Sequence, residues 1–184
     1  MDEIGIICIL PDEVKNYQQE LRQKMAIQFG LDDVANPIIP AHITIKYRFP
    51  VENLDELEQA IQEFSLSQRK TKWLLQGFSY FKNADDYVIF MDVIPSAETR
   101  KAHASFLDRL RKISWVQWGQ FDNASLHYHV TLSAQGITSK NFEAVWLFAN
   151  QQEKPNFGAF FDNLSLVQIT EYSRSVYKTY WFQN

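Results

Sequence analysis

The sequence predicts an α+β fold made of two similar lobes related by a pseudo-twofold axis. Two observations support this prediction. The same strand signature occurs twice, as His42-Ile43-Thr44-Ile45 and as His129-Val130-Thr131-Leu132. Around each copy, strand-like apolar runs and segments of helical periodicity follow one another in a repeated order, which is typical of related units that share a core. The 184 residues, 46% of them hydrophobic, suffice for one domain, residues 1–184, built from both lobes.

The first half predicts a strand, a helix, the first motif strand and a second helix. Residues 4–10 are a continuous apolar run, which is typical of a strand buried on both faces. Pro11 opens a segment with apolar residues at helical spacing, and Gly30 ends it. After the motif strand, Asn53 and Glu56 form a capping pair for a helix that we expect to end near residue 67.

The second half predicts two strands, a helix, the second motif strand, a helix and two final strands. The expected ranges are strands at 73–81 and 87–93 joined by a polar hairpin loop, a helix from 95, a strand at 127–133, a helix capped by Ser139, and strands near 162–169 and 175–182. His103 falls on the apolar side of its helix, so we interpret it as a packed residue.

Composition and charge exclude several classes of partner. The formal net charge of −4 argues against a broad duplex DNA-binding surface, whereas a small anionic substrate needs only a local basic patch. The single cysteine, Cys8, cannot form an internal disulfide, which favours a buried, inert thiol and a cytoplasmic location. The N-terminal apolar run is too short to cross a membrane. Aromatic residues make up 15% of the chain, so we expect some to stack on a base or sugar.

The duplicated signature presents a proton carrier beside a hydroxyl group, twice. In an extended strand successive side chains alternate between faces, so each histidine shares a side with the threonine two residues later. Imidazole can act as a base or as an acid near neutral pH. Two such strands could therefore supply one acid and one base to a phosphate ester.

These paired strands and the repeated order of elements resemble the two-histidine (2H) phosphoesterase superfamily. That superfamily includes bacterial 2′-5′ RNA ligase-like proteins and 2′,3′-cyclic nucleotide phosphodiesterases, and the chain is most similar to its compact bacterial RNA-ligase-like branch. The resemblance implies an antiparallel sheet in each lobe, helices packed outside and a central groove that holds both motifs.

The resemblance also assigns roles to the motif residues. It implies that His42 and His129 are the catalytic pair, with His129 as general base and His42 as general acid, and that Thr44 and Thr131 donate hydrogen bonds to phosphate oxygens. The expected enzyme opens the 2′,3′-cyclic phosphate of nucleotides or RNA ends without a metal or another cofactor. By microscopic reversibility it could also join RNA ends through a 2′-5′ bond.

Residues that flank the motifs give further predictions. Lys46 is in phase with His42 and Thr44, so it either contacts the phosphate or is an edge lysine that blunts strand pairing. His127 is in phase with His129 and is expected at the rim of the site; an H-x-H metal site is the alternative. Ala134 stands where better-known members of the superfamily often have a basic residue.

Four aromatic residues near the ends of the expected strands are candidates for base stacking: Tyr47, Phe49, Phe121 and Trp181. The expected partner is a small nucleotide or an RNA end, and we expect a monomer. Two other interpretations stay open. The same groove could bind a nucleotide without turning it over, or His127 and His129 could hold a metal in a metal-dependent hydrolase.

Overall fold

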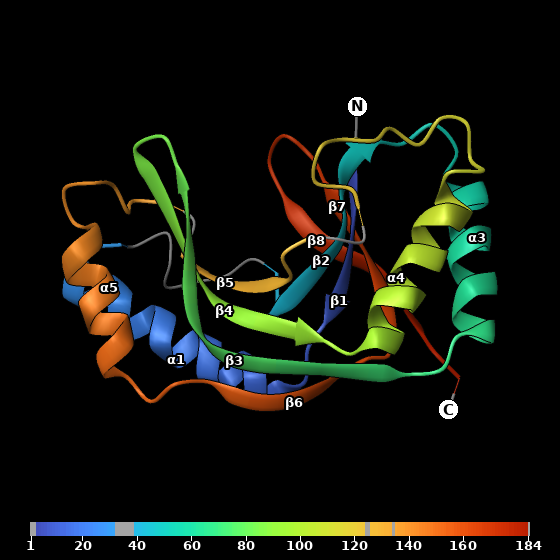
Figure 1. Ribbon diagram of the computed structural model, residues 1–184. Coiled ribbons are helices and arrows are strands. Elements are labelled where there is room, and N and C mark those ends of the chain that lie inside the picture. Colours follow the sequence, from blue (N-terminus) through green and yellow to red (C-terminus); the bar gives the residue numbers. More distant parts are fainter. Residues whose placement is uncertain (1–2, 32–38, 124–125, 134, 184) are drawn as a thin grey trace.

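Two four-stranded antiparallel sheets carry the two sequence motifs (Figure 1). This computed structural model describes residues 3–31, 39–123, 126–133 and 135–183. The first sheet has the order β2 (His42–Pro50), β1 (Glu3–Ile9), β7 (Asn163–Ile169) and β8 (Arg174–Trp181). The second has the order β5 (His129–Ser133), β4 (Asp86–Pro95), β3 (Thr71–Asn83) and β6 (Asn156–Phe161).

The two sheets have the same plan, which confirms the predicted bilobal α+β fold. Each motif strand, β2 or β5, lies at the edge of its sheet and pairs with the strand that precedes it along the chain, β1 or β4. A helix connects the members of each pair: α1 (Asp12–Phe29) between β1 and β2, and α4 (Ala97–Leu110) between β4 and β5. The repeated order in the sequence therefore corresponds to a repeated unit in space.

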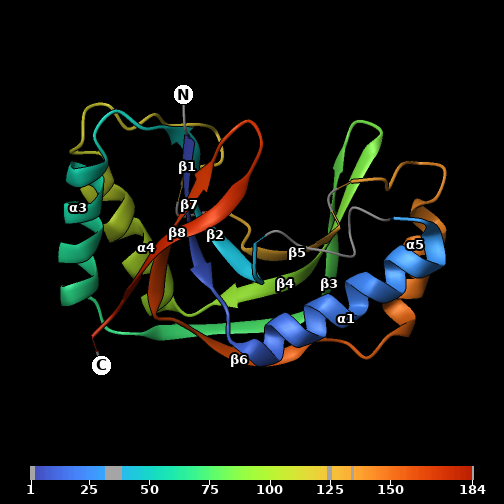
Figure 2. The same ribbon diagram turned by 180° about the vertical axis from the view of Figure 1, so that it is seen from behind.

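Helices cover the outer ends of the two lobes (Figures 1 and 2). α3 (Leu54–Ser67) packs against β7, β8 and α4 beside the first sheet. α1 packs against β5 and α5 (Phe142–Gln151) beside the second sheet. Because α1 is encoded between β1 and β2 but contacts β5, it links one motif strand to the other lobe. None of the described helices is both long and apolar enough to span a membrane.

Two predictions about the strands were wrong. The last two strands, β7 and β8, belong to the first sheet and not to the second-half lobe, and β6 was not predicted as a separate strand. The cause lies in β1, whose five central residues are buried and which bonds β2 on one edge and β7 on the other. The backbone N–H and C=O groups on both edges of a buried strand need partners, and those on the second edge pair with a strand from the C-terminal end of the chain.

The predicted helix ends are mostly confirmed. Asn53 Oδ1 accepts a hydrogen bond from the Glu56 backbone N–H at 3.2 Å and so caps α3. Gly30 ends α1 in the left-handed conformation, with φ of 64°. The prediction for α5 was wrong, because Asn141 and not Ser139 occupies the position before its first turn. Ser139 instead donates to the Asp85 carboxylate at 3.1 Å.

Candidate active site

The two motif strands meet between the lobes. β2 and β5 are edge strands that contact each other, and a histidine begins each of them. The charge of His129 lowers the pKa of His42, because two positive charges disfavour each other. The fold thus brings together two histidines that are far apart in the sequence.

Both histidine rings are held in the same way. His42 Nδ1 lies 2.7 Å from the Pro40 carbonyl oxygen, and His129 Nδ1 lies 3.0 Å from the His127 carbonyl oxygen. A carbonyl oxygen only accepts, so Nδ1 carries the proton in both neutral rings. Each ring is bonded to the carbonyl two residues before it, and Nε2 is left as the nitrogen that takes up or gives up a proton.

The surroundings lower the pKa of both histidines. Burial is the main cause at each ring, and the electrostatic effects of His129 and Arg22 lower the pKa of His42 further. The rings of Phe81 and Phe90 both lie 5.0 Å from the His129 ring, so this burial comes in part from an aromatic wall. The Asp92 carboxylate opposes the effect by raising the pKa of His129. Both rings are therefore neutral in the unoccupied site at neutral pH.

The threonines follow the alternation that the motif predicts. In both strands the apolar motif residues are buried, whereas His42, Thr44, His129 and Thr131 are partly exposed. Their shared partial exposure leaves both hydroxyl groups on the same side as the imidazole of their own strand. The arrangement offers two proton carriers and two hydroxyl donors to one anion.

His127 and His129 pack against the same two phenylalanine rings, and His127 is the more exposed of the two. His127 Nε2 donates to Asp92 Oδ1 at 2.8 Å, and its ring contacts the edges of Phe81 and Phe90. Asp92 pairs directly with His129 across the β4–β5 ladder. Within the part of the chain that the structure describes, no group of three or more His, Cys, Asp or Glu side chains is arranged to hold a metal ion.

Lys46 does not reach the site, so its predicted phosphate contact was wrong. It lies on the edge strand β2, as the alternative expected, but its ammonium is buried and not exposed at that edge. Its side chain is 1% exposed and its Nζ lies 2.8 Å from Asp122 Oδ2 and 2.8 Å from the Gln117 carbonyl oxygen. The register of β2 against β1 shifts between the partners of Thr44 and Lys46, which is a β-bulge. A bulge adds one residue and reverses the face of everything that follows it, so strand phase could not be extended from His42 to Lys46.

The four candidates for base stacking differ in how exposed their rings are. Tyr47 and Phe121 are 49% and 54% exposed, and their ring centroids lie 6.0 Å apart. Phe49 is 1% exposed, so its predicted stacking role was wrong. Trp181 is exposed at the end of β8, at the sheet edge opposite β2. Ala134 lies outside the described residues.

His103 connects the two motif strands. It is fully buried on α4, which confirms the prediction that it is a packed residue. Its Nε2 donates to the Ile45 carbonyl oxygen at 2.8 Å, and its Nδ1 accepts from the Tyr128 hydroxyl at 2.5 Å. Ile45 belongs to the first motif and Tyr128 directly precedes His129. No sequence pattern indicated this connection, because it depends on how α4 packs.

Acid is expected to weaken the fold through His103. Burial lowers its pKa from 6.5 to about 4, so the unfolded chain binds a proton that the folded protein resists. This stabilisation is complete above pH 6.5 and is lost as the pH falls to 4, at a cost of about 2–3 kcal/mol. Denaturant unfolding from pH 7 to 4 measures the loss. The His103→Gln variant should show a shallower pH dependence; identical slopes would contradict this role.

α1 contributes two polar residues that sequence reasoning missed. Gln18 Nε2 donates to the Thr131 carbonyl oxygen at 2.7 Å, and Arg22 Nη1 lies 3.4 Å from the same oxygen. Gln18 is buried although it is polar. A glutamine four residues after Val14 in an apolar helical stripe, followed four residues later by an arginine, was the available signal.

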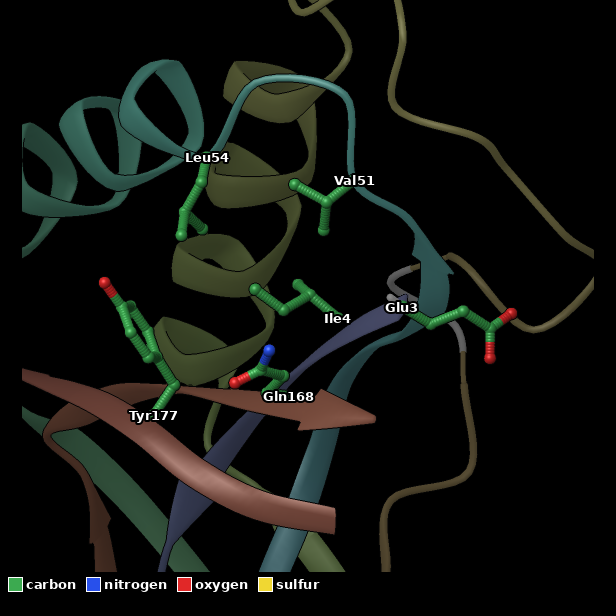
Figure 3. A pocket seen from close by; sticks show the side chains of 6 residues that line it. All are labelled: Glu3, Ile4, Val51, Leu54, Gln168 and Tyr177. Atoms are coloured by element: carbon green, nitrogen blue, oxygen red, sulfur yellow. The ribbon is translucent and has the colours of Figure 1, made fainter. Parts of the chain in front are cut away.

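The pocket in Figure 3 is separate from the motif residues. It has a volume of about 330 Å³ and is lined by Glu3, Ile4, Val51, Leu54, Gln168 and Tyr177. These residues come from the beginning of β1 and its neighbours, whereas His42 pairs with Ile9 at the other end of β1. The pocket therefore does not belong to the candidate active site.

Comparison with known proteins agrees with this geometry. Residues 10–172 match the model of the 2′-5′ RNA ligase superfamily. No curated protein sequence matches the chain. Among solved structures, TT0787 of Thermus thermophilus is 14% identical with a TM-score of 0.63, and the alignment covers 98% of this chain and 97% of that one. E. coli LigT is 12% identical with a TM-score of 0.59, covering 100% and 98%.

Kluyveromyces marxianus Usb1 is a more distant structural relative, 12% identical with a TM-score of 0.51 and a coverage of 98% of each chain. These likenesses show a shared fold. The family match spans most of the sequence and includes both motif strands, which confirms the resemblance to the two-histidine phosphoesterases. The chain belongs to the 2′-5′ RNA ligase superfamily.

Proposed function

We propose that the protein is a metal-independent phosphoesterase that opens the 2′,3′-cyclic phosphate of nucleotides or RNA ends. The observation that carries this proposal is the matched pair of histidines on contacting edge strands, each tethered through Nδ1 to a backbone carbonyl. Such tethers fix the ring orientation and present Nε2 to a substrate, as acid–base catalysis requires.

The proposed reaction needs one proton removed and one delivered. One imidazole takes a proton from water as the water oxygen attacks phosphorus. The other donates a proton to the ribose oxygen as its bond to phosphorus breaks, so the product is a phosphomonoester with a free ribose hydroxyl. Thr44 and Thr131 donate hydrogen bonds to the non-bridging oxygens, where negative charge builds up in the transition state.

Charges around the pair favour one assignment of roles. Arg22 and His129 both disfavour the protonated form of His42. At His129 the charge effects oppose each other, because His127 disfavours the protonated form and Asp92 favours it. We therefore assign His42 as general base and His129 as general acid for hydrolysis. This is the reverse of the assignment that the family resemblance implies, and the roles exchange again if the enzyme joins RNA ends.

The substrate is proposed to be a nucleotide or an RNA end. Solved structures of E. coli LigT contain 3′-AMP and NADP⁺, which supports a nucleotide for this chain as well. Tyr47 and Phe121, exposed beside β2, are proposed to stack on a base. We propose His127 as a rim contact, and a cytoplasmic monomer consisting of one bilobal domain.

A substrate panel in EDTA tests this function. It comprises 2′,3′-cyclic mononucleotides, RNA with a cyclic phosphate end, 2′-5′-linked oligonucleotides and ADP-ribose cyclic phosphate. We expect turnover of at least one cyclic phosphate. Tight binding measured by calorimetry with zero turnover would favour a non-catalytic binding module instead. Activity that EDTA removes and metal restores would favour a metal-dependent hydrolase.

The pH profile should have an acidic optimum. Productive enzyme has one neutral and one protonated histidine, and this form peaks between the two apparent pKa values of the pair. Both pKa values lie below 6.5 in the unoccupied site. kcat/KM should therefore peak below about pH 6.5 and fall tenfold per pH unit on the alkaline side. The bound phosphate anion raises both pKa values, so kcat should peak at higher pH than kcat/KM. A kcat/KM optimum near pH 8 would contradict this account.

A further inference from the structure

Arg22 lies at the junction of the two motif strands. It comes from α1, which packs against β5, and its Nη1 is 3.4 Å from the carbonyl oxygen of the motif residue Thr131. Its charge also acts on His42, at the start of the other motif strand. One guanidinium thus contacts one motif strand and acts electrostatically on the histidine of the other.

The Thr131 carbonyl does not require a charged donor. Gln18 already donates to that oxygen at 2.7 Å, which is the shorter of the two contacts. A neutral glutamine is enough to satisfy an edge-strand carbonyl. A guanidinium costs more to bury, and burial is the reason that the pKa of Arg22 is lowered. A partly buried positive charge that acts on His42 becomes more favourable when an anion occupies the site.

The local charge matters because the protein as a whole is acidic. Its formal net charge is −4, so an anionic substrate needs a positive group at the site itself. Lys46, the lysine nearest to the first motif in sequence, is buried against Asp122 and cannot serve. The planar fork of a guanidinium matches two phosphate oxygens.

We propose that Arg22 binds the substrate phosphate between β2 and β5, as the cationic partner of the two motif threonines. This inference rests on the proposed function, because it takes the bound anion to be the phosphate of that substrate. Arg22 supplies the positive charge from a helix that precedes both motifs. It also keeps His42 in its neutral, basic form until the phosphate arrives.

The test compares Arg22→Met and Arg22→Lys with a matched control, Lys24→Met. Lys24 lies on the same helix, but its side chain is 50% exposed and pairs with Glu20. Inorganic phosphate is the probe, with its affinity measured by calorimetry. Arg22→Met should weaken phosphate binding roughly 10- to 100-fold, as expected for loss of a charge-assisted hydrogen bond. Arg22→Lys should weaken it less, and Lys24→Met should leave it unchanged.

A second measurement does not depend on turnover. The pKa of His42, followed by NMR through its ring protons, should rise in Arg22→Met, because a nearby positive charge has been removed. It should stay in place in Lys24→Met and in Arg22→Lys. If Arg22→Met fails to fold, Arg22→Lys still tests the phosphate affinity.

The outcomes separate this inference from the proposed function. Weaker phosphate binding in the Arg22 variants of a protein that turns over no cyclic phosphate would support the phosphate site and overturn the proposed activity. Unchanged phosphate affinity and an unchanged His42 pKa in Arg22→Met, in a protein with full turnover, would overturn the role of Arg22 alone.

Discussion

Replacing His42 or His129 with alanine is expected to lower kcat for cyclic-phosphate hydrolysis by roughly 10²- to 10⁴-fold, because each removes one member of an acid–base pair. The rings bond only through Nδ1 to backbone carbonyls, at 2.7 and 3.0 Å among the described contacts, so their removal should leave the strands paired. Steady-state kinetics in EDTA, with circular dichroism to check folding, measures the effect.

The two variants should differ in a way that reveals their roles. A diester with a 4-nitrophenolate leaving group needs no proton on departure. If His129 is the acid, His129→Ala should lose much less activity on that substrate than on a ribose cyclic phosphate, whereas His42→Ala should lose about as much on both. The opposite pattern would restore the assignment implied by the family resemblance.

Two further variants serve as controls for the histidine pair: the double alanine variant and a substitution of the neighbouring His127. Groups that act as a unit give non-additive losses, so the double alanine variant should be little slower than the worse single variant. His127→Ala removes an imidazole of the same type beside the site, together with its bond to Asp92, and should cost far less than either motif histidine. Equal losses in all three variants would indicate that the ring at 129 has no special role.

Replacing Asp122 with alanine is expected to destabilise the fold by about 3–5 kcal/mol, because it leaves the Lys46 ammonium buried without its partner. The side chains are 1% and 3% exposed, and the two carboxylate oxygens of Asp122 also accept from the backbone N–H groups of Tyr47 and Gly119. Burial already lowers the pKa of Lys46, and Asp122 counteracts this. Denaturant unfolding at pH 7 measures the loss.

An exposed ion pair of the same length serves as a control, because it shows the effect of charge pairing without burial. Arg109 and Glu63 are also 2.8 Å apart, but their side chains are 35% and 53% exposed. Glu63→Ala should cost less than about 1 kcal/mol. The double variant Lys46→Met/Asp122→Asn removes the buried ammonium and keeps an acceptor for the Tyr47 backbone N–H. It should therefore recover most of the stability that Asp122→Ala loses. Equal effects of Asp122→Ala and Glu63→Ala would contradict this account.

Local patterns in the sequence predicted the elements and the motif geometry. Alternation over four residues put each histidine on the same strand face as its threonine. Asn53 correctly indicated the start of α3, Gly30 the end of α1, and the apolar run of residues 4–10 the strand β1. Each of these features depends on neighbours a few residues away. The two-lobe plan followed because the order of elements repeats.

Features that depend on distant partners could not be predicted in this way. The bulge before Lys46 is invisible in an alternating sequence, so its side chain was placed on the wrong face. β7 belongs to the first sheet because the backbone groups on the second edge of β1 need hydrogen-bond partners. His103 and Arg22 lie on helices whose packing partners are more than 20 residues away, and no spacing rule connects them with the motifs.

The most direct test of the central claim is the rate at which wild-type protein opens the 2′,3′-cyclic phosphate of a mononucleotide or RNA end in EDTA, followed by ³¹P NMR. We expect a phosphomonoester product at a rate that EDTA does not change and that His42→Ala or His129→Ala reduces at least about 100-fold, the lower bound for acid–base catalysis. No product from any cyclic phosphate, or a rate that neither substitution lowers, would contradict it.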